Sequence, residues 1–171
     1  MTEVGIKYTK EHPLDTKDKK ILSALYENGR YSIAEIAKKT GLRRDSIIYR
    51  IKKMQENQLI MGFQPVINPP ALGYPNIAIM LLKTKSLSEA LQTQFIKKTK
   101  SLPQIIHLAI VLGKFNYYLV AVYKEHQQLY QLLEQVKSFV PDQVLDYEIL
   151  SVVEEPKYES FLDLINTYQK K

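Results

Sequence analysis

The chain has 171 residues, of which 45% are hydrophobic and 25% charged, as expected for a globular protein of one medium or two small domains. It has no cysteine, which excludes disulfides and thiolate metal sites, and its three histidines lack metal-ligand spacing, so we expect neither a metal nor a cofactor. The positive charge lies in residues 1–64, with 13 Lys and Arg against 8 Asp and Glu, whereas the remainder has 11 against 10, an asymmetry typical of a chain in which one domain meets a polyanion.

The first residues carry charges that no apolar run follows, so the sequence predicts no signal peptide. No stretch approaches the ~18 apolar residues that a membrane span requires. We therefore expect a cytoplasmic protein with no membrane partner.

Two short helices are predicted at the start of the first domain. The first is capped by Asp15 or Thr16 and runs to about Glu27. Ser32, followed three residues later by Glu35, forms a capping box that opens the second helix.

A third helix is predicted from about Arg43 to about Asn57, after Gly41 has supplied a left-handed stop to the second. Apolar residues recur in it at i, i+4 and i+7 and predict a face turned toward a core: Ile47, Ile51 and Met54. Two short helices joined by a tight turn are typical of a helix-turn-helix unit.

Arginines are concentrated at this third helix. The chain has four arginines against twenty lysines, and three of the four fall within eight residues. The planar fork of arginine fits guanine edges and phosphates better than the lysine ammonium does. We therefore predict that this helix binds double-stranded DNA through Arg43, Arg44, Ser46, Tyr49, Arg50, Lys52 and Lys53.

Two residues of the helix leave alternatives open. Arg50 is either a DNA contact or a structural residue bonded to carbonyls or to an acid inside the domain. Ile48, an apolar β-branched residue on the outer face, suits either a thymine methyl or a contact with another domain.

An apolar stretch at residues 59–67, with the sequence LIMGFQPVI, predicts a strand or wing that leaves the helical unit. Pro69 and Pro70 follow, and adjacent prolines cannot continue a strand or helix. We place a helix-turn-helix domain at residues 1–58 and a linker at 59–74.

The second domain, residues 75–154, alternates strands and helices. Ser86 and Glu89 predict a capping box. The predicted elements are a strand at 76–83, a helix to about residue 100, strands at 104–112 and 116–123, a helix at 125–139 and a strand at 144–153. This βαββαβ order predicts a ferredoxin-like sandwich, so the fold class is α+β, a winged helix-turn-helix domain followed by this sandwich.

An antiparallel sheet covered by helices on one side leaves its other face in need of cover. The strands and the second helix of this domain are rich in tyrosine, including Tyr117, Tyr118, Tyr123 and Tyr130, and tyrosine is enriched at interfaces. We therefore expect a homodimer. Residues 155–171, beyond the break at Pro156, predict one more amphipathic helix.

Several matches in order and spacing carry a family resemblance: Leu14-Asp15-x-x-Asp18-x-x-Ile21-Leu22, Asn28-Gly29-Arg30, Ile36-Ala37, Gly41-Leu42, Arg50-Ile51 and Ile60-x-Gly62-Phe63. Followed by a ferredoxin-like domain, they resemble the Lrp/AsnC family of bacterial and archaeal regulators, over roughly residues 14–154. The resemblance implies a sequence-specific DNA-binding transcriptional regulator without enzymatic activity. It also implies a dimer formed through the second-domain sheets, often assembled into an octamer, and a small effector such as an amino acid.

The chain departs from the family pattern at two places. Arg43 stands where the family usually has a Ser or Thr that caps the helix. The effector-binding turn of the family matches Leu112, Gly113, Lys114 and Asn116, but its hydroxyl residue is replaced by Leu112 and its two acids by Lys114 and Asn116. Since a carboxylate is the natural counter-ion of an amino group, we expect the site not to bind a standard amino acid in the family's usual way.

Two alternatives remain at this point. The sirohaem decarboxylases resemble this family in their two-domain plan and act on an acidic tetrapyrrole, for which Arg30, Arg50 and His107 are the candidates here. Their cations should converge in a pocket, whereas DNA-binding cations should lie along an exposed helix. An architectural protein that coats DNA with little specificity is the second alternative.

Overall fold

The computed structural model describes residues 11–168, and the chain divides into two compact units. One unit comprises the chain up to Val66 together with the segment from Lys157 onward, and the other is Ile67–Pro156. The C-terminal segment, which the sequence presented as a separate helix, therefore belongs to the N-terminal unit.

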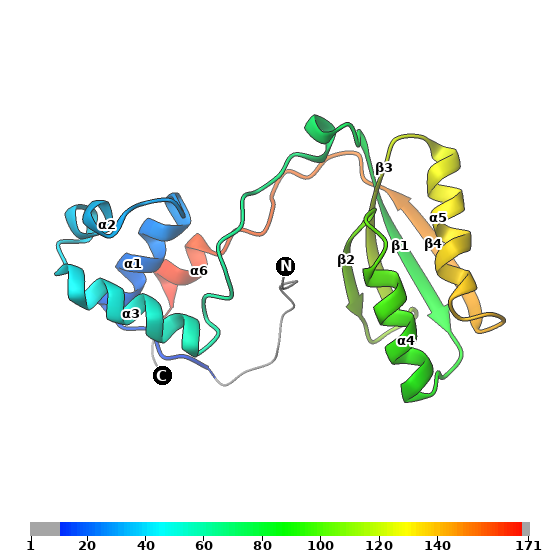
Figure 1. Cartoon of the computed structure of the whole chain (residues 1–171), viewed down its shortest axis with the longest axis horizontal. Coiled ribbons are helices and arrows are strands. Elements are labelled where there is room, and N and C mark those ends of the chain that lie inside the picture. The colour runs from blue at the N-terminus through cyan, green and yellow to red at the C-terminus, as the bar shows by residue number, and fades with distance from the viewer. Residues whose placement is uncertain (1–10, 169–171) are drawn as a thin grey trace. The chain divides into compact units, whose positions relative to one another are not determined.

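The N-terminal unit is built on the three predicted helices, α1 (Thr16–Glu27), α2 (Ile33–Thr40) and α3 (Arg44–Glu56) (Figure 1). Each contributes to one core, whose buried apolar residues are Ile21, Ala24, Ile36, Ile47 and Met54. Ile51 is half-buried and packs at the margin of this core. The prediction that the apolar residues of α3 at i, i+4 and i+7 face the core is thereby confirmed.

Local side-chain bonds define where these helices begin and end. Asp15, rather than Thr16, caps α1 and forms a capping box with Asp18. The Ser32 box at α2 is present as predicted, and Gly41 ends α2 at φ 71°, a left-handed conformation that glycine adopts without steric cost. Arg43 occupies the N-cap position of α3 without a side-chain cap bond.

The strand or wing predicted at residues 59–67 is wrong, because this stretch has no regular secondary structure. A strand requires a neighbour to complete its hydrogen bonds, and the N-terminal unit has no strand among its described residues. Pro65 also removes one backbone donor from the stretch. A short 3-10 helix, η1 (Pro69–Leu72), follows.

The C-terminal helix α6 (Leu162–Thr167) lies against α1. Ser23 Oγ donates to Asn166 Oδ1 at 3.1 Å, and the Tyr26 hydroxyl accepts from the backbone N of Phe161 at 3.0 Å and donates to the Glu159 carbonyl. The Tyr168 hydroxyl donates to Glu11 Oε1 at 2.6 Å. These bonds attach the C-terminal segment to the start of the N-terminal unit.

We expect Tyr26→Phe to loosen this attachment, because it removes the hydroxyl that bonds the backbone of both Glu159 and Phe161. The lost bonds should cost about 1 kcal/mol, which corresponds to about fivefold faster local opening of α6. Hydrogen exchange of peptides covering α6, measured by mass spectrometry, checks this. Tyr130→Phe, at an exposed position of the other unit, is the matched control, and equal exchange in both variants would refute the prediction.

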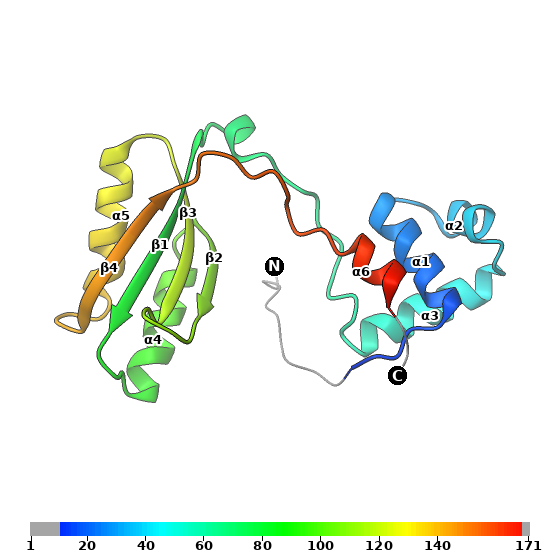
Figure 2. The same ribbon diagram turned by 180° about the vertical axis from the view of Figure 1, so that it is seen from behind.

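The second unit has the predicted βαββαβ order: β1 (Asn76–Thr84), α4 (Glu89–Lys100), β2 (Ile105–Ile110), β3 (Tyr117–Tyr123), α5 (His126–Ser138) and β4 (Val144–Ser151). The strands form one antiparallel sheet in the order β2-β3-β1-β4. Both helices cover the same face of the sheet (Figures 1 and 2).

The capping box predicted at Ser86 and Glu89 is wrong by two residues. Ser88 is the N-cap of α4, and its hydroxyl accepts from the backbone N of Leu91 at 3.3 Å. Leu87 packs against the core of the unit, which is consistent with the chain remaining outside the helix until Ser88.

Alternate residues of the two central strands face the helices and are buried: Ala78, Met80 and Leu82 on β1, and Tyr117, Leu119 and Ala121 on β3. Their neighbours point to the opposite face, which no helix of the unit covers (Figure 2). Ile77, Ile79, Leu81, Tyr118 and Val120 are half-exposed there. We call this apolar surface the open sheet face.

Candidate nucleic-acid interface

Two arginines without ion-pair partners among the described residues stand at the start of α3. Arg43 and Arg44 are exposed, and within residues 11–168 neither has an ion-pair partner. Unpaired amides at a helix N-terminus add partial positive charge at the same place. This end of α3 therefore offers two free guanidinium groups to an anion.

The rest of the outward side of α3 carries two more lysines and two apolar side chains. Ile48 is 52% exposed and Tyr49 is 65% exposed. Lys53 is exposed, and Lys52 Nζ lies 3.8 Å from Glu56 Oε1 in a loose surface pair. Ser46 is half-buried. Most of the predicted contact residues are thus accessible on α3. Together with Ile48 we call these exposed residues the α3 face: Arg43, Arg44, Ile48, Tyr49, Lys52 and Lys53.

Arg50 is positioned differently, because its guanidinium joins α3 to the start of α1. One of its nitrogens, Nη1, lies 2.7 Å from Asp15 Oδ2 and 2.7 Å from Asp18 Oδ1. Although partial burial alone would raise the pKa of Asp15, the Asp18 backbone amide and the Arg50 guanidinium hold it below its usual value. The structure therefore favours the structural alternative for Arg50.

We expect Arg50→Met to destabilise the N-terminal unit by about 2 kcal/mol, because it leaves the largely buried Asp18 carboxylate, 10% exposed, without its counter-ion. Lys52→Met on the same helix is the matched control, since its exposed i,i+4 pair contributes less than about 0.5 kcal/mol. Thermal unfolding followed by circular dichroism measures both.

The pH dependence provides a second check on Arg50. Asp15 has a lowered pKa in the folded state, so its pairing stabilises the fold above the unfolded value of about 4 and is lost as the pH falls through the folded value. The difference between the wild type and Arg50→Met should therefore narrow in acid. A pH-independent difference would contradict the ion-pair explanation.

A groove of about 690 Å³ runs between the N-terminal segment and α3. The groove is lined by His12, Arg50 and Lys53 and by four carboxylates: Glu11, Asp15, Asp18 and Glu56. Neither Arg30 nor His107 is among its lining residues, and His107 lies on β2 in the other unit, edge-to-face with Tyr118. The cations proposed for an acidic tetrapyrrole do not line this groove together.

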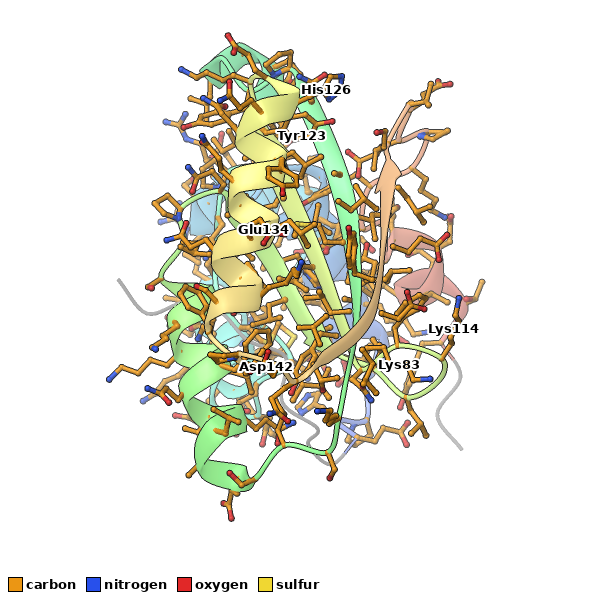
Figure 3. The ribbon with its side chains drawn as sticks, turned by 90° about the vertical axis from the view of Figure 1, so that its right-hand side faces the viewer. Lys83, Lys114, Tyr123, His126, Glu134 and Asp142 are labelled. Carbon is orange, nitrogen blue, oxygen red and sulfur yellow. The ribbon has the colours of Figure 1, made fainter. Side chains whose placement is uncertain are left out.

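The turn between β2 and β3 contains the residues predicted to bind an effector. Lys114 Nζ lies 3.9 Å from Asp146 Oδ2 of β4 and 4.8 Å from the centre of the Phe115 ring. Asn116 Oδ1 accepts from the backbone N of Thr84 at 2.8 Å, which ties the turn to β1. Figure 3 shows Lys114 and Lys83 at this end of the sheet, and Asp146 lies opposite Lys83 in the strand register.

The two other residues of the turn offer little to a ligand by themselves. Leu112 is fully exposed, and Gly113 has φ +154°, a conformation that residues with a Cβ rarely adopt. The polar side chains of the turn already have partners within the chain, because Lys114 pairs with Asp146 and Asn116 accepts a hydrogen bond from Thr84.

Sequence reasoning did not identify Asp15 and Asp18 as the partners of Arg50 or Asp146 as the partner of Lys114. The available signal was the pair of acids at the start of α1, Asp15 at the N-cap and Asp18 in the first turn, which also suits helix capping.

None of the helices within residues 11–168 combines the length and apolarity needed to cross a membrane. In that same part of the chain, no group of His, Asp and Glu is arranged to hold a metal ion.

The N-terminal unit matches a known DNA-binding domain, and most of the chain is similar to known transcriptional regulators. Residues 14–55 match the AsnC-type helix-turn-helix domain. The HTH-type transcriptional regulator FL11 of Pyrococcus furiosus is 33% identical over 125 residues, which are 73% of this chain and 81% of the relative. The leucine-responsive regulatory protein of Haemophilus influenzae is 29% identical over 151 residues, 88% of this chain and 90% of the relative.

Solved structures share the two-unit fold. The structure of E. coli AsnC matches with a TM-score of 0.75 at 24% identity, covering 88% of this chain and 99% of that protein. The transcriptional regulator NMB0573 of Neisseria meningitidis, solved as a complex with L-Met, matches with a TM-score of 0.75 at 19% identity, covering 85% of this chain and 93% of that protein.

Proposed function

The chain belongs to the Lrp/AsnC family of transcriptional regulators, and we propose that it binds operator DNA sequence-specifically through the α3 face. Arg43 and Arg44 carry this proposal, because they are exposed and free of ion pairs within the described chain. Arginine in the major groove binds guanine O6 and N7 or the neighbouring phosphates. Family membership also places the chain among regulators rather than enzymes, which removes the decarboxylase alternative.

The proposed binding species is a two-fold dimer that forms through the open sheet face. This face is apolar at its centre and is not covered by any helix of the second unit. Burial of such a surface favours association, and two-fold pairing makes the same residues meet their own copies. A dimer would present two copies of α3 to successive major grooves about 34 Å apart.

Selection of duplexes from a random pool by the full-length protein tests the proposal. A selected duplex should bind about 10³-fold more tightly than a scrambled duplex of equal length at about 0.15 M salt. An architectural protein would instead bind both duplexes alike, with the same salt dependence. Equal affinity for both would therefore overturn the assignment of a sequence-specific regulator.

We further propose that the turn at residues 112–116 does not recognise the amino group of a free amino acid. The residues that occupy its two polar positions are the cation Lys114 and the neutral Asn116, and both are engaged with the fold. A cationic ligand group would meet repulsion from Lys114 and would have to displace it from Asp146.

We expect the standard amino acids, each added at millimolar concentration, to raise the melting temperature of the protein by no more than about 1 °C. The reason is that Lys114 and the neutral Asn116 occupy the polar positions of the turn, and the carboxylate of Asp146 is paired with Lys114. A fluorescence melting screen with and without the selected duplex measures this. A saturable rise that depends on the concentration of one amino acid would refute the proposal.

A further inference from the structure

We infer that Ile48 reads the C5-methyl group of a thymine in each half-site of the operator. This inference rests on the proposed function, since it concerns what the α3 face recognises. Ile48 would contact an apolar group of the DNA, whereas the cations of the same α3 face would bind phosphates and polar base edges.

Ile48 lies in line with two cations on the surface of α3. Residues four apart are neighbours on a helix, so Arg44, Ile48 and Lys52 form one continuous row. Ile48 is 52% exposed in the middle of this row, whereas the adjacent Ile47 is fully buried in the core of the unit. Ile47 therefore stabilises the core, whereas Ile48 is accessible to an external partner.

The chemistry around Ile48 favours DNA as that partner. A protein partner that covered Ile48 would also remove charge from water at Arg44 and Lys52, which is costly without matching acids. The major groove satisfies both requirements, because its phosphates neutralise the flanking cations and its thymine methyl is the apolar group on the base edges.

The shape of the side chain suits this contact. Isoleucine is β-branched, and a single χ1 rotamer dominates for it in a helix, so little conformational freedom is lost when it meets a base. It offers no hydrogen bond, so it cannot discriminate by polar contacts. Removing the methyl group from its thymine should thus remove most of its contribution to specificity.

Replacing single thymines by deoxyuridine in the selected duplex tests the inference, because uracil lacks the methyl group but keeps every donor and acceptor. Each thymine is replaced symmetrically in both half-sites, and binding of the full-length protein is measured by fluorescence anisotropy. At one position we expect about fourfold weaker binding per half-site, or about fifteenfold for the dimer.

Ile48→Ala should lose this discrimination and bind the thymine and deoxyuridine duplexes within about twofold of each other at that position. Lys53→Ala, expected to contact phosphate, is the matched control, since it should weaken binding to both duplexes equally and keep their ratio. Because Ile48 and Lys53 are both exposed, both variants should have the melting temperature of the wild type.

Two results would overturn the inference while leaving the proposed function intact. In one, no deoxyuridine substitution weakens binding although the protein still prefers the selected duplex to the scrambled one. In the other, the ratio of affinities for the thymine and deoxyuridine duplexes is the same for Ile48→Ala as for the wild type at every thymine. Failure to select any duplex would instead refute the proposed function itself.

Discussion

Replacement of both Arg43 and Arg44 by alanine is expected to weaken binding to the selected duplex at least about 100-fold. A dimer loses two side chains in each half-site, and a loss of about 1.4 kcal/mol per half-site already gives this factor. Both arginines are exposed and make no ion pair within the described residues, so the loss should come from DNA contacts and not from unfolding.

Anisotropy titrations at one fixed salt concentration measure this loss, and thermal unfolding verifies the fold of the variant. The control is the double variant Lys85→Ala and Lys97→Ala, which removes the same charge from exposed positions of the second unit. We expect the control to stay within about threefold of the wild type. A comparable loss in both double variants would mean that net charge, and not α3, determines the affinity.

Leu81→Asp should give the second large effect, which is dissociation of the dimer. Leu81 lies on the central strand β1 at the open sheet face, opposite Tyr118 on one side and Glu148 on the other. A carboxylate there would be desolvated in the interface, twice in a two-fold dimer. The monomer has one copy of the α3 face and so makes half of the dimer's DNA contacts. It should therefore bind the operator at least about 10³-fold more weakly than the wild-type dimer.

Sedimentation velocity gives the mass of the variant, and circular dichroism shows whether the monomer remains folded. Tyr130→Asp, at an exposed position of α5 outside the sheet, introduces the same charge and should leave the dimer intact. If Leu81→Asp sedimented as the wild-type species, the open sheet face would not be the interface.

The parts of the fold that were predictable are those determined by local interactions. The Ser32 box, the Gly41 stop and the spacing of Ile47 and Met54 each depend on residues within one or two helical turns, and all are confirmed. The cap at Ser86 was displaced to Ser88 in a stretch where Leu87 packs on a distant core. Capping patterns alone cannot anticipate such packing.

Long-range pairing explains what else was missed. The stretch at residues 59–67 has a strand-like composition, but a strand also needs a partner that composition does not provide. The sequence left Arg50 open between a DNA contact and a structural bond to an acid, because its partner Asp18 lies on another helix and sequence proximity does not identify it. The attachment of α6 to α1 through Tyr26 likewise joins residues more than a hundred positions apart.

Chemical modification of the few arginines tests directly the central claim that the α3 face binds DNA. The chain has four arginines, so modification by phenylglyoxal followed by mass spectrometry reports each of them separately. With the selected duplex bound, Arg43 and Arg44 should become protected, whereas Arg50 should react equally slowly with and without DNA because Asp15 and Asp18 hold it. Unchanged modification of Arg43 and Arg44 while the duplex remains bound would contradict the assignment of α3 as the DNA-binding surface.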